Sequence, residues 1–231
     1  MRLIFVRHGE PDYDNDCLTE TGRSQAQKTA DRLTDEPMTA IYASPMGRAV
    51  ETAFFTAKQH GLEIQKLDFM HEIDWGTVPD AEPLPCEGHP WTLGFRLLTE
   101  EPELIGSQAW REHRYFRDNL CLEYYDRVAE AFDGFLAGFG ICRKDGLYES
   151  RMENDDTIAL FAHGGSGAVM FSHVLSLPFP FVLTTLPYGV CSISVIDFSP
   201  QLDGRIIPRL SLFNDMTHLG QVKEERLRFE K

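Results

Sequence analysis

The chain has 231 residues, and its 36 acidic side chains against 22 Lys and Arg give a net charge of -14. A surface of that sign repels nucleic acids and anionic membranes, so neither is expected as a partner, and an anionic substrate would need a local positive pocket. The composition, 42% hydrophobic and 25% charged, is that of an ordinary globular protein with a sizeable core.

The first part of the chain alternates strands and helices. Residues 2–7 are apolar and β-branched and predict a buried strand. The segment TETGRSQAQKTADRLTDE has apolar residues at helical spacing, with Thr19 or Thr21 as its N-cap. MTAIYASP predicts a short strand that stops at Pro45, and RAVETAFFTAKQHG predicts a helix that ends at Gly61.

Residues 77–122 interrupt this alternation with five prolines and two tryptophans, which indicates an insertion on the scaffold. A helix over about 123–138 and a polar loop over 143–156 are expected next. TIALFAHGGSG then repeats the pattern of the first strand, an apolar run that ends in His and Gly, and AVMFSHVLSL predicts another helix. The final expected strands are CSISVIDFS and PRLSLFND.

Strands that alternate with helices predict an α/β fold, here a three-layer α/β/α sandwich with a largely parallel central sheet. We expect one domain over 1–231, with 77–122 as a lid-like segment. In such sheets ligands bind beyond the carboxyl ends of the strands. The pairs His8–Gly9 and His163–Gly164 both occupy that kind of position, although they lie far apart in the sequence. Their recurrence points to a shared site.

The cysteines and the hydropathy pattern predict a cytoplasmic protein. The five cysteines are Cys17, Cys86, Cys121, Cys142 and Cys191. An odd number without a CxxC pair favours reduced thiols over a disulfide framework or a zinc site. Arg7 interrupts the first apolar run, and no run approaches 18 apolar residues, so we expect neither a signal peptide nor a membrane span.

Six segments together resemble the motifs of the histidine phosphatase, or phosphoglycerate mutase-like, superfamily. In chain order they are RHGE from Arg7, LTETGRSQA from Leu18, YASPMGRAVETA from Tyr42, HEIDWG from His71, FAHGGSG from Phe161 and LFNDMTHL from Leu212. The likeness covers most of the chain except 77–122. It implies the α/β/α fold described above and a site for phosphoryl transfer.

The resemblance assigns roles to five residues. It implies that His8 is the nucleophile and that Arg7 and Arg48 hold the phosphate oxygens. It also implies that His163 adds a cationic or donor group and that Glu72 protonates the leaving oxygen. Elementary chemistry agrees, because a guanidinium can fork two equatorial oxygens and a neutral imidazole attacks near pH 7 without a strong base. Asp74 lies close enough in sequence to be the acid instead of Glu72.

The other candidate substrate contacts are Gly9, Glu10, Asn15, Gly164, Arg111 and Arg114. The resemblance is incomplete after the signature, since Pro11 and Asp14 stand where many members have Thr and a phosphate-binding Asn. Asn15 is one position away and is the candidate replacement. Arg111 and Arg114 belong to the expected insertion, which also carries aromatic side chains suited to cover the rest of a ligand. The loop before Leu18 is shorter than the bisphosphate-binding loop of the mutases, which favours a phosphatase.

Three other motifs compete for chemistry. CLTETGRS matches the pattern of cysteine phosphatases, with Cys17 as nucleophile, but no buried strand precedes it and Glu20 would face the anion. GGSGA approximates the nucleophile elbow of α/β-hydrolases around Ser166, with Asp197 and His218 as partners, but Ala168 replaces its last glycine. DYDND hints at a metal loop, but it has no Gly at the sixth position.

The sequence therefore predicts a hydrolase of the histidine acid phosphatase type, a phosphomonoesterase that uses no metal and no other cofactor. Its substrate would be a small phosphorylated metabolite, and a phosphohistidine would form as the intermediate. One alternative is a 2,3-bisphosphoglycerate-dependent phosphoglycerate mutase. The other is a phosphate-binding scaffold protein of the same fold with little turnover. A homodimer is left open.

Overall fold

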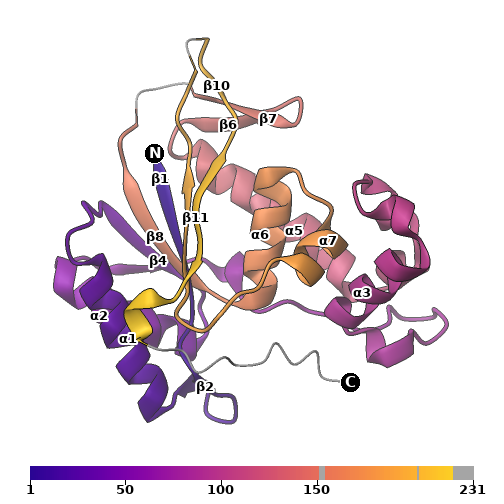
Figure 1. Cartoon of the computed structure of the whole chain (residues 1–231), viewed down its shortest axis with the longest axis horizontal. Coiled ribbons are helices and arrows are strands. Elements are labelled where there is room, and N and C mark those ends of the chain that lie inside the picture. Colours follow the sequence, from indigo (N-terminus) through magenta and orange to yellow (C-terminus); the bar gives the residue numbers. More distant parts are fainter. Residues whose placement is uncertain (151–153, 202, 221–231) are drawn as a thin grey trace. The chain divides into compact units, whose positions relative to one another are not determined.

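The computed structural model describes residues 1–150, 154–201 and 203–220, shown in Figure 1. Their contacts group the chain into two compact units. Unit 1 consists of Met1–His71, Asp133–Gly164 and the described residues from Tyr188 onward, and unit 2 of Glu72–Phe132 and Gly165–Pro187. In the described ranges, no helix has the length and apolar character that crossing a bilayer requires.

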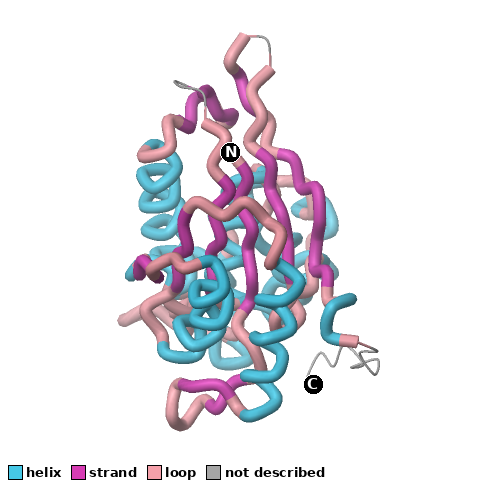
Figure 2. The backbone as a smooth tube through the Cα atoms, turned by 90° about the vertical axis from the view of Figure 1, so that its left-hand side faces the viewer, coloured by secondary structure: helices cyan, strands magenta, loops and turns pink. Residues whose placement is uncertain are grey.

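A six-stranded sheet in the order β11–β9–β1–β8–β4–β5 forms the centre of unit 1. The strands are β1 (Arg2–Arg7), β4 (Ala40–Ala43), β5 (Ile64–Lys66), β8 (Thr157–Ala162), β9 (Ile193–Asp197) and β11 (Arg209–Asp215). β1, β8, β4 and β5 pair in parallel, whereas β9 is antiparallel to both β1 and β11. Figure 2 shows these strands side by side. The prediction of a largely parallel central sheet is confirmed.

Helices α1 (Glu20–Leu33) and α2 (Gly47–His60) pack on one face of this sheet. Leu33 of α1 and Ala53 of α2 share a buried cluster with Ile41 of β4. The predicted ends of both helices are confirmed: the Thr19 side chain accepts a hydrogen bond from the Gly22 amide, and α2 stops at Gly61, whose φ of 66° a residue without Cβ adopts easily.

The opposite face of the sheet is also covered by helical residues. Tyr42 alternates with Ile41 along β4 and therefore points to the other side. Its ring meets Phe135, near the end of α5 (Leu120–Ala137), edge to face at 4.8 Å. Helical residues on both faces give the layered α/β architecture that the alternating pattern predicts. The five cysteines are all free thiols, as their spacing suggested.

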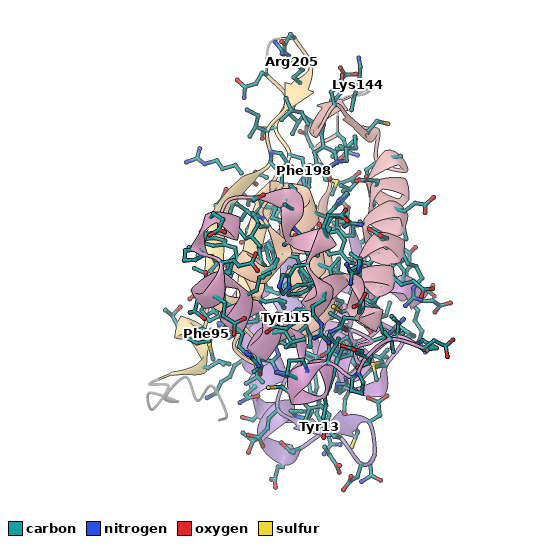
Figure 3. The ribbon with its side chains drawn as sticks, turned by 90° about the vertical axis from the view of Figure 1, so that its right-hand side faces the viewer. Tyr13, Phe95, Tyr115, Lys144, Phe198 and Arg205 are labelled. Atoms are coloured by element: carbon teal, nitrogen blue, oxygen red, sulfur yellow. The ribbon has the colours of Figure 1, made fainter. Side chains whose placement is uncertain are left out.

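The expectation of a polar loop over 143–156 is wrong for its first part. β6 (Ile141–Lys144) and β7 (Leu147–Ser150) form a hairpin that pairs with β10 (Arg205–Ile206), while 151–153 lie outside the described residues. Asp145 and Gly146 have φ of 50° and 81°, the two positive values of a type I′ turn. Figure 3 places Lys144 and Arg205 at the end of unit 1 that lies away from Tyr13, which belongs to the turn between β2 (Pro11–Asp12) and β3 (Cys17–Leu18).

Unit 2 is helical and has an aromatic core of its own. Its longer elements are α3 (Pro90–Glu100), α4 (Arg114–Arg117), residues 120–132 of α5, α6 (Gly164–Leu175) from its second residue, and α7 (Phe179–Thr185). Trp110 is fully buried, with ring centroids 5.4 Å from Phe116 and Tyr125 and 5.8 Å from Phe179. Because Tyr125 and Phe179 complete this core, the compact unit extends beyond the expected insertion of 77–122.

Shorter features complete the description. The 3-10 turns are η1 (Asp68–Met70), η2 (Pro85–Gly88), η3 (Pro102–Leu104), η4 (Gln108–Glu112) and η5 (Thr217–Leu219). The helix expected from residue 123 begins at Leu120 because the Asn119 side chain accepts from the Cys121 amide, which supplies a cap at the N-terminus.

Candidate active site

Two histidines meet at the carboxyl ends of adjacent strands. Arg7, the last residue of β1, is in register with Ala162, the last residue of β8, so His8 and His163 leave the sheet side by side. The His8 amide donates to the Ala162 carbonyl at 2.9 Å, and the two imidazole centroids are 5.1 Å apart. Both rings are fully buried. The shared site expected from the repeated His–Gly pattern is therefore present in unit 1.

The hydrogen bonds of His8 fix its tautomer. Its Nδ1 lies 2.8 Å from the carbonyl of Gly9, which can only accept, so Nδ1 carries the proton. Nε2 is then left with its lone pair, and the Nε–H of Arg48 donates to it at 3.4 Å. Burial and the neighbouring guanidinium of Arg7, with Arg48 adding to them, lower the pKa of His8 to about 3. The ring is therefore a neutral imidazole whose Nε2 carries the lone pair.

The peptide that orients His8 is itself anchored. The Gly9 amide donates to Thr52 Oγ1 at 3.0 Å, and this hydroxyl donates to the Arg48 carbonyl one turn earlier in α2 at 2.7 Å. A Cβ on Gly9 would lie 2.7 Å from the Gly22 carbonyl oxygen, so only glycine fits this close approach. Thr52 thus links the peptide after His8 to the helix that carries Arg48.

Two arginines provide positive charge beside His8. Arg7 Nη1 donates to the carbonyl of Tyr188, and its Nε is a buried donor for which the described residues offer no acceptor. Arg48 is 4% exposed and directs Nε at His8. Donors of this kind, aimed at one imidazole, are what an anionic group transferred to Nε2 requires.

Arg48 also binds an acid that the sequence did not single out. Asp16 Oδ1 lies 2.6 Å from Arg48 Nη1, and Asp16 Oδ2 accepts from the Gly47 amide at 2.6 Å. Partial burial opposes ionisation of this carboxyl, but the Gly47 and Arg48 hydrogen bonds outweigh it and lower its pKa. The Tyr13 ring, labelled in Figure 3, lies 5.4 Å from the Arg48 guanidinium carbon.

His163 is held by a serine that directly follows the neighbouring strand. Ser44 follows β4, is buried, and places its Oγ 2.7 Å from His163 Nε2. Burial, with His8, Arg48 and Arg7 nearby, lowers the pKa of His163 to about 2. Of the two roles that the sequence left open for His163, cation or donor, the neutral ring favours hydrogen-bond donation.

Glu72 begins unit 2 and is fixed there by backbone amides. Its Oε1 accepts from the amides of Ile73 at 3.0 Å and Gly165 at 2.9 Å. Gly165 has no space for a side chain, since a Cβ would lie 2.2 Å from Ile73 Cγ2. It is the second residue after His163 in the chain. Asp74, the other candidate acid, is exposed and pairs with Arg127 at 3.0 Å.

Residues 3–89 match the family model described as the histidine phosphatase superfamily, branch 1. Over these residues the chain is similar to the histidine phosphatase superfamily. Phosphoserine phosphatase 1 of Hydrogenobacter thermophilus is 35% identical over 121 residues, which are 47% of this chain and 56% of that protein. A probable phosphoglycerate mutase of Photorhabdus laumondii is 31% identical over 39% of the chain, so these two matches span about half of each relative's length.

Other relatives align over nearly the whole chain at lower identity. A probable phosphoglycerate mutase of Proteus mirabilis is 24% identical over 96% of both chains. The solved structure of a mycobacterial glucosyl-3-phosphoglycerate phosphatase superposes with a TM-score of 0.59 at 24% identity, covering 92% of this chain and 98% of that one. The likeness to solved structures supports the fold.

The remaining predicted site residues lie in other surroundings. Glu10 is exposed and accepts from Thr19 Oγ1 at 2.7 Å, and Asn15 is exposed and donates to Asp12 at 2.8 Å. In unit 2, Arg111 forms a two-pronged pair with Asp126 at 2.6 and 2.7 Å. Arg114 Nη2 donates to the Pro83 carbonyl at 3.5 Å, and Gly164 opens α6 directly after His163.

The competing motifs are engaged in structural contacts. Arg23, the phosphate clamp that a cysteine phosphatase would need, pairs with Glu51 at 2.5 Å. The acids of DYDND do not form one cluster, because Asp12 accepts from Asn15 while Asp16 binds Arg48. His218, suggested as the base of a serine triad, directs Nε2 to Thr29 Oγ1 at 3.0 Å.

Proposed function

We propose that this protein is a phosphomonoester phosphatase of the histidine phosphatase superfamily that acts on a small phosphorylated metabolite. One observation carries the proposal: His8 is a buried, neutral imidazole whose unprotonated Nε2 faces Arg48 and lies next to the buried donor of Arg7. Relatives named as phosphoserine phosphatase and glucosyl-3-phosphoglycerate phosphatase support the same class of substrate.

The proposed reaction has two steps. In the first, the Nε2 lone pair of His8 attacks phosphorus, the N–P bond forms, and the ester P–O bond breaks with its electron pair going to the alcohol oxygen. Glu72, in its acid form, protonates that oxygen. In the second, the Glu72 carboxylate accepts a proton from water, whose oxygen attacks phosphorus and returns the N–P electron pair to Nε2. Arg7 and Arg48 stabilise the equatorial oxygens in both steps.

We assign the acid to Glu72 rather than Asp74. The amides of Ile73 and Gly165 both donate to one oxygen of Glu72 and so fix the orientation of its carboxyl group. Asp74 is exposed, and its carboxylate is paired with the Arg127 guanidinium at 3.0 Å. Glu72→Gln should therefore lower kcat much more for substrates with poor leaving groups than for an aryl phosphate, and Asp74→Asn should not.

The test of the proposed function is phosphate release from a panel of phosphorylated metabolites, combined with acid-quench trapping of the phosphoenzyme. His8→Ala should abolish turnover and the acid-labile phosphoenzyme, since loss of a covalent route costs several orders of magnitude. Cys17→Ser is the matched control and should turn over at nearly the normal rate. A His8→Ala protein that keeps more than about a tenth of the activity would refute the assignment of the nucleophile.

The same panel separates the alternatives. Relatives named as probable phosphoglycerate mutases make mutase activity the first alternative to test. A mutase would pass the phosphoryl group to a second substrate rather than to water, and a phosphate-binding scaffold would bind vanadate without releasing phosphate from any ester. The turn Tyr13–Asp16 between β2 and β3 favours hydrolysis, because it is shorter than the bisphosphate-binding loop of the mutases. The cytoplasmic location, the oligomeric state and the absence of nucleic-acid partners stay predictions.

A further inference from the structure

Asp16 places a negative charge on the arginine that the proposed reaction needs for phosphate. Its Oδ1 is 2.6 Å from Nη1 of Arg48, and Arg48 has 5% of its side chain exposed. The other oxygen accepts from the Gly47 amide in the first turn of α2, where the helix dipole also attracts anions. The Asp16 carboxylate therefore binds both the Arg48 guanidinium and the N-terminus of α2, and each of these would attract a phosphoryl group.

The contact has a structural function as well. Met46, the N-cap of α2, offers no side-chain hydrogen bond, so Asp16 supplies from another segment the acceptor that this helix start lacks. Capping needs only an acceptor oxygen. The negative charge is not required for it, because Asn and Ser cap helices about as well as Asp.

We propose that Asp16 is an internal competitor for the phosphoryl group: its carboxylate must give up Arg48 before substrate can bind there. The inference rests on the proposed function. A phosphate monoester dianion at Nη1 of Arg48 would meet the Asp16 carboxylate within hydrogen-bonding distance of the same donor, where like charges repel.

The position of Asp16 allows it to release Arg48. It is the last residue of the turn Tyr13–Asp16, and 42% of its side chain is exposed, so water can solvate the carboxylate once it leaves. Its φ of 46° lies in the left-handed region, so other backbone conformations are open to it at little cost. Tyr13, at the other end of the turn, is 68% exposed.

Asp16→Asn tests the proposal because it removes the charge and keeps an acceptor for the Gly47 amide. The matched control is Asp14→Asn, which removes the same charge from the same turn, at a position with no bond to Arg48 among the described residues. The probes are inorganic phosphate and orthovanadate, with Kd measured by calorimetry at pH 7. Asp16→Asn should bind both about 3- to 30-fold more tightly than the unmodified protein, the range of one charge-assisted contact with an exposed partner. Asp14→Asn should stay within about 1.5-fold.

Asp16→Ser provides a second uncharged cap and should tighten phosphate binding to the same extent as Asp16→Asn. Unchanged or weaker binding in both variants, with Asp14→Asn unaffected, would overturn the proposal and show instead that Asp16 orients Arg48. The result is independent of turnover. If the Asp16 variants bind phosphate more tightly but the protein hydrolyses no ester, the competition by Asp16 stands and the proposed phosphatase function is refuted. If the protein hydrolyses esters but the Asp16 variants bind phosphate no more tightly, the phosphatase function stands and the competition is refuted.

Discussion

Replacing Thr52 by valine should separate the positioning of the nucleophile from the general stability of α2. Valine has the shape of threonine, so the substitution removes the hydroxyl and leaves the packing. The hydroxyl is the acceptor for the Gly9 amide at 3.0 Å, and Thr52 is fully buried. Leaving a buried amide without an acceptor costs about 1–3 kcal/mol of folding free energy. For a protein of this size, that corresponds to a fall in Tm of about 2–12 °C.

The chain offers a matched control one turn later in the same helix. Thr56 is also fully buried, but its hydroxyl has no hydrogen-bond partner within the described part of the chain. Thr56→Val therefore removes a buried hydroxyl that contributes no hydrogen bond to stability, and the Tm of this variant should be unchanged or higher. The two variants have the same chemical change, helix and degree of burial, and they differ in the two hydrogen bonds of the Thr52 hydroxyl, from the Gly9 amide and to the Arg48 carbonyl.

Activity gives the second measurement. The Gly9 carbonyl orients His8 through Nδ1 at 2.8 Å, so a Gly9 peptide without its anchor leaves the imidazole less well aligned for attack. Misalignment of this kind lowers kcat by about 10- to 100-fold, whereas the phosphate Kd, set by other groups, should hold. Thr52→Ser should restore kcat, and Thr56→Val should not change it. Equal kcat in the two valine variants would refute the positioning role, even if their Tm values differed.

Three further predictions follow from the site and from unit 2. EDTA should leave phosphate release unchanged, because side-chain donors hold the phosphoryl group; full loss that a divalent ion restores would point to a metal. Folding lowers the pKa of His8 to about 3 and that of His163 to about 2, so below pH 6.5 the unfolded chain binds protons that the folded chain does not. The free energy of unfolding should therefore fall as the pH drops from 6.5 toward 3, and these two histidines should leave it flat above pH 6.5. Arg111→Ala and Arg114→Ala should change KM differently for different phosphoesters and hardly affect a small aryl phosphate; an equal loss of kcat on every substrate would place them in the chemistry.

The parts of the site that the sequence predicted are those that a local pattern fixes. The strand before His8 and the strand before His163 are apolar runs, and parallel strands end at the same edge of a sheet, so two His–Gly pairs were enough to predict their meeting. Thr19 and Gly61 were found in the same way, since capping depends on residues next to each other in sequence. The Asp145–Gly146 hairpin had such a signal as well, a DG pair between two short β-prone runs, and could have been found.

The missed contacts join residues that are far apart in sequence. Asp16 reaches Arg48 across 32 residues and Thr52 reaches Gly9 across 43, and neither side chain belongs to a pattern that demands its partner. In the sequence, Asp14 stands where many members of the resembled family have a phosphate-binding Asn, whereas the structure places Asp16 beside Arg48. Which of the acids in a short turn faces inward depends on its φ and ψ values, and the φ of 46° at Asp16 cannot be read from the residue type.

In the proposed reaction, the same two guanidinium groups act on both His8 and the phosphoryl group. Imidazole in water has a pKa near 6.5, so half of it would be protonated and unreactive at that pH. Burial and the charges of Arg7 and Arg48 remove that proton, and the same charges attract the phosphoryl group that Nε2 attacks. A bound phosphoryl dianion neutralises these charges and so opposes their effect on the pKa of His8. The lone pair is therefore protected from protons most strongly before substrate binds. Once the dianion is in place, the imidazole depends on the Gly9 carbonyl at Nδ1 to keep Nε2 as the attacking atom.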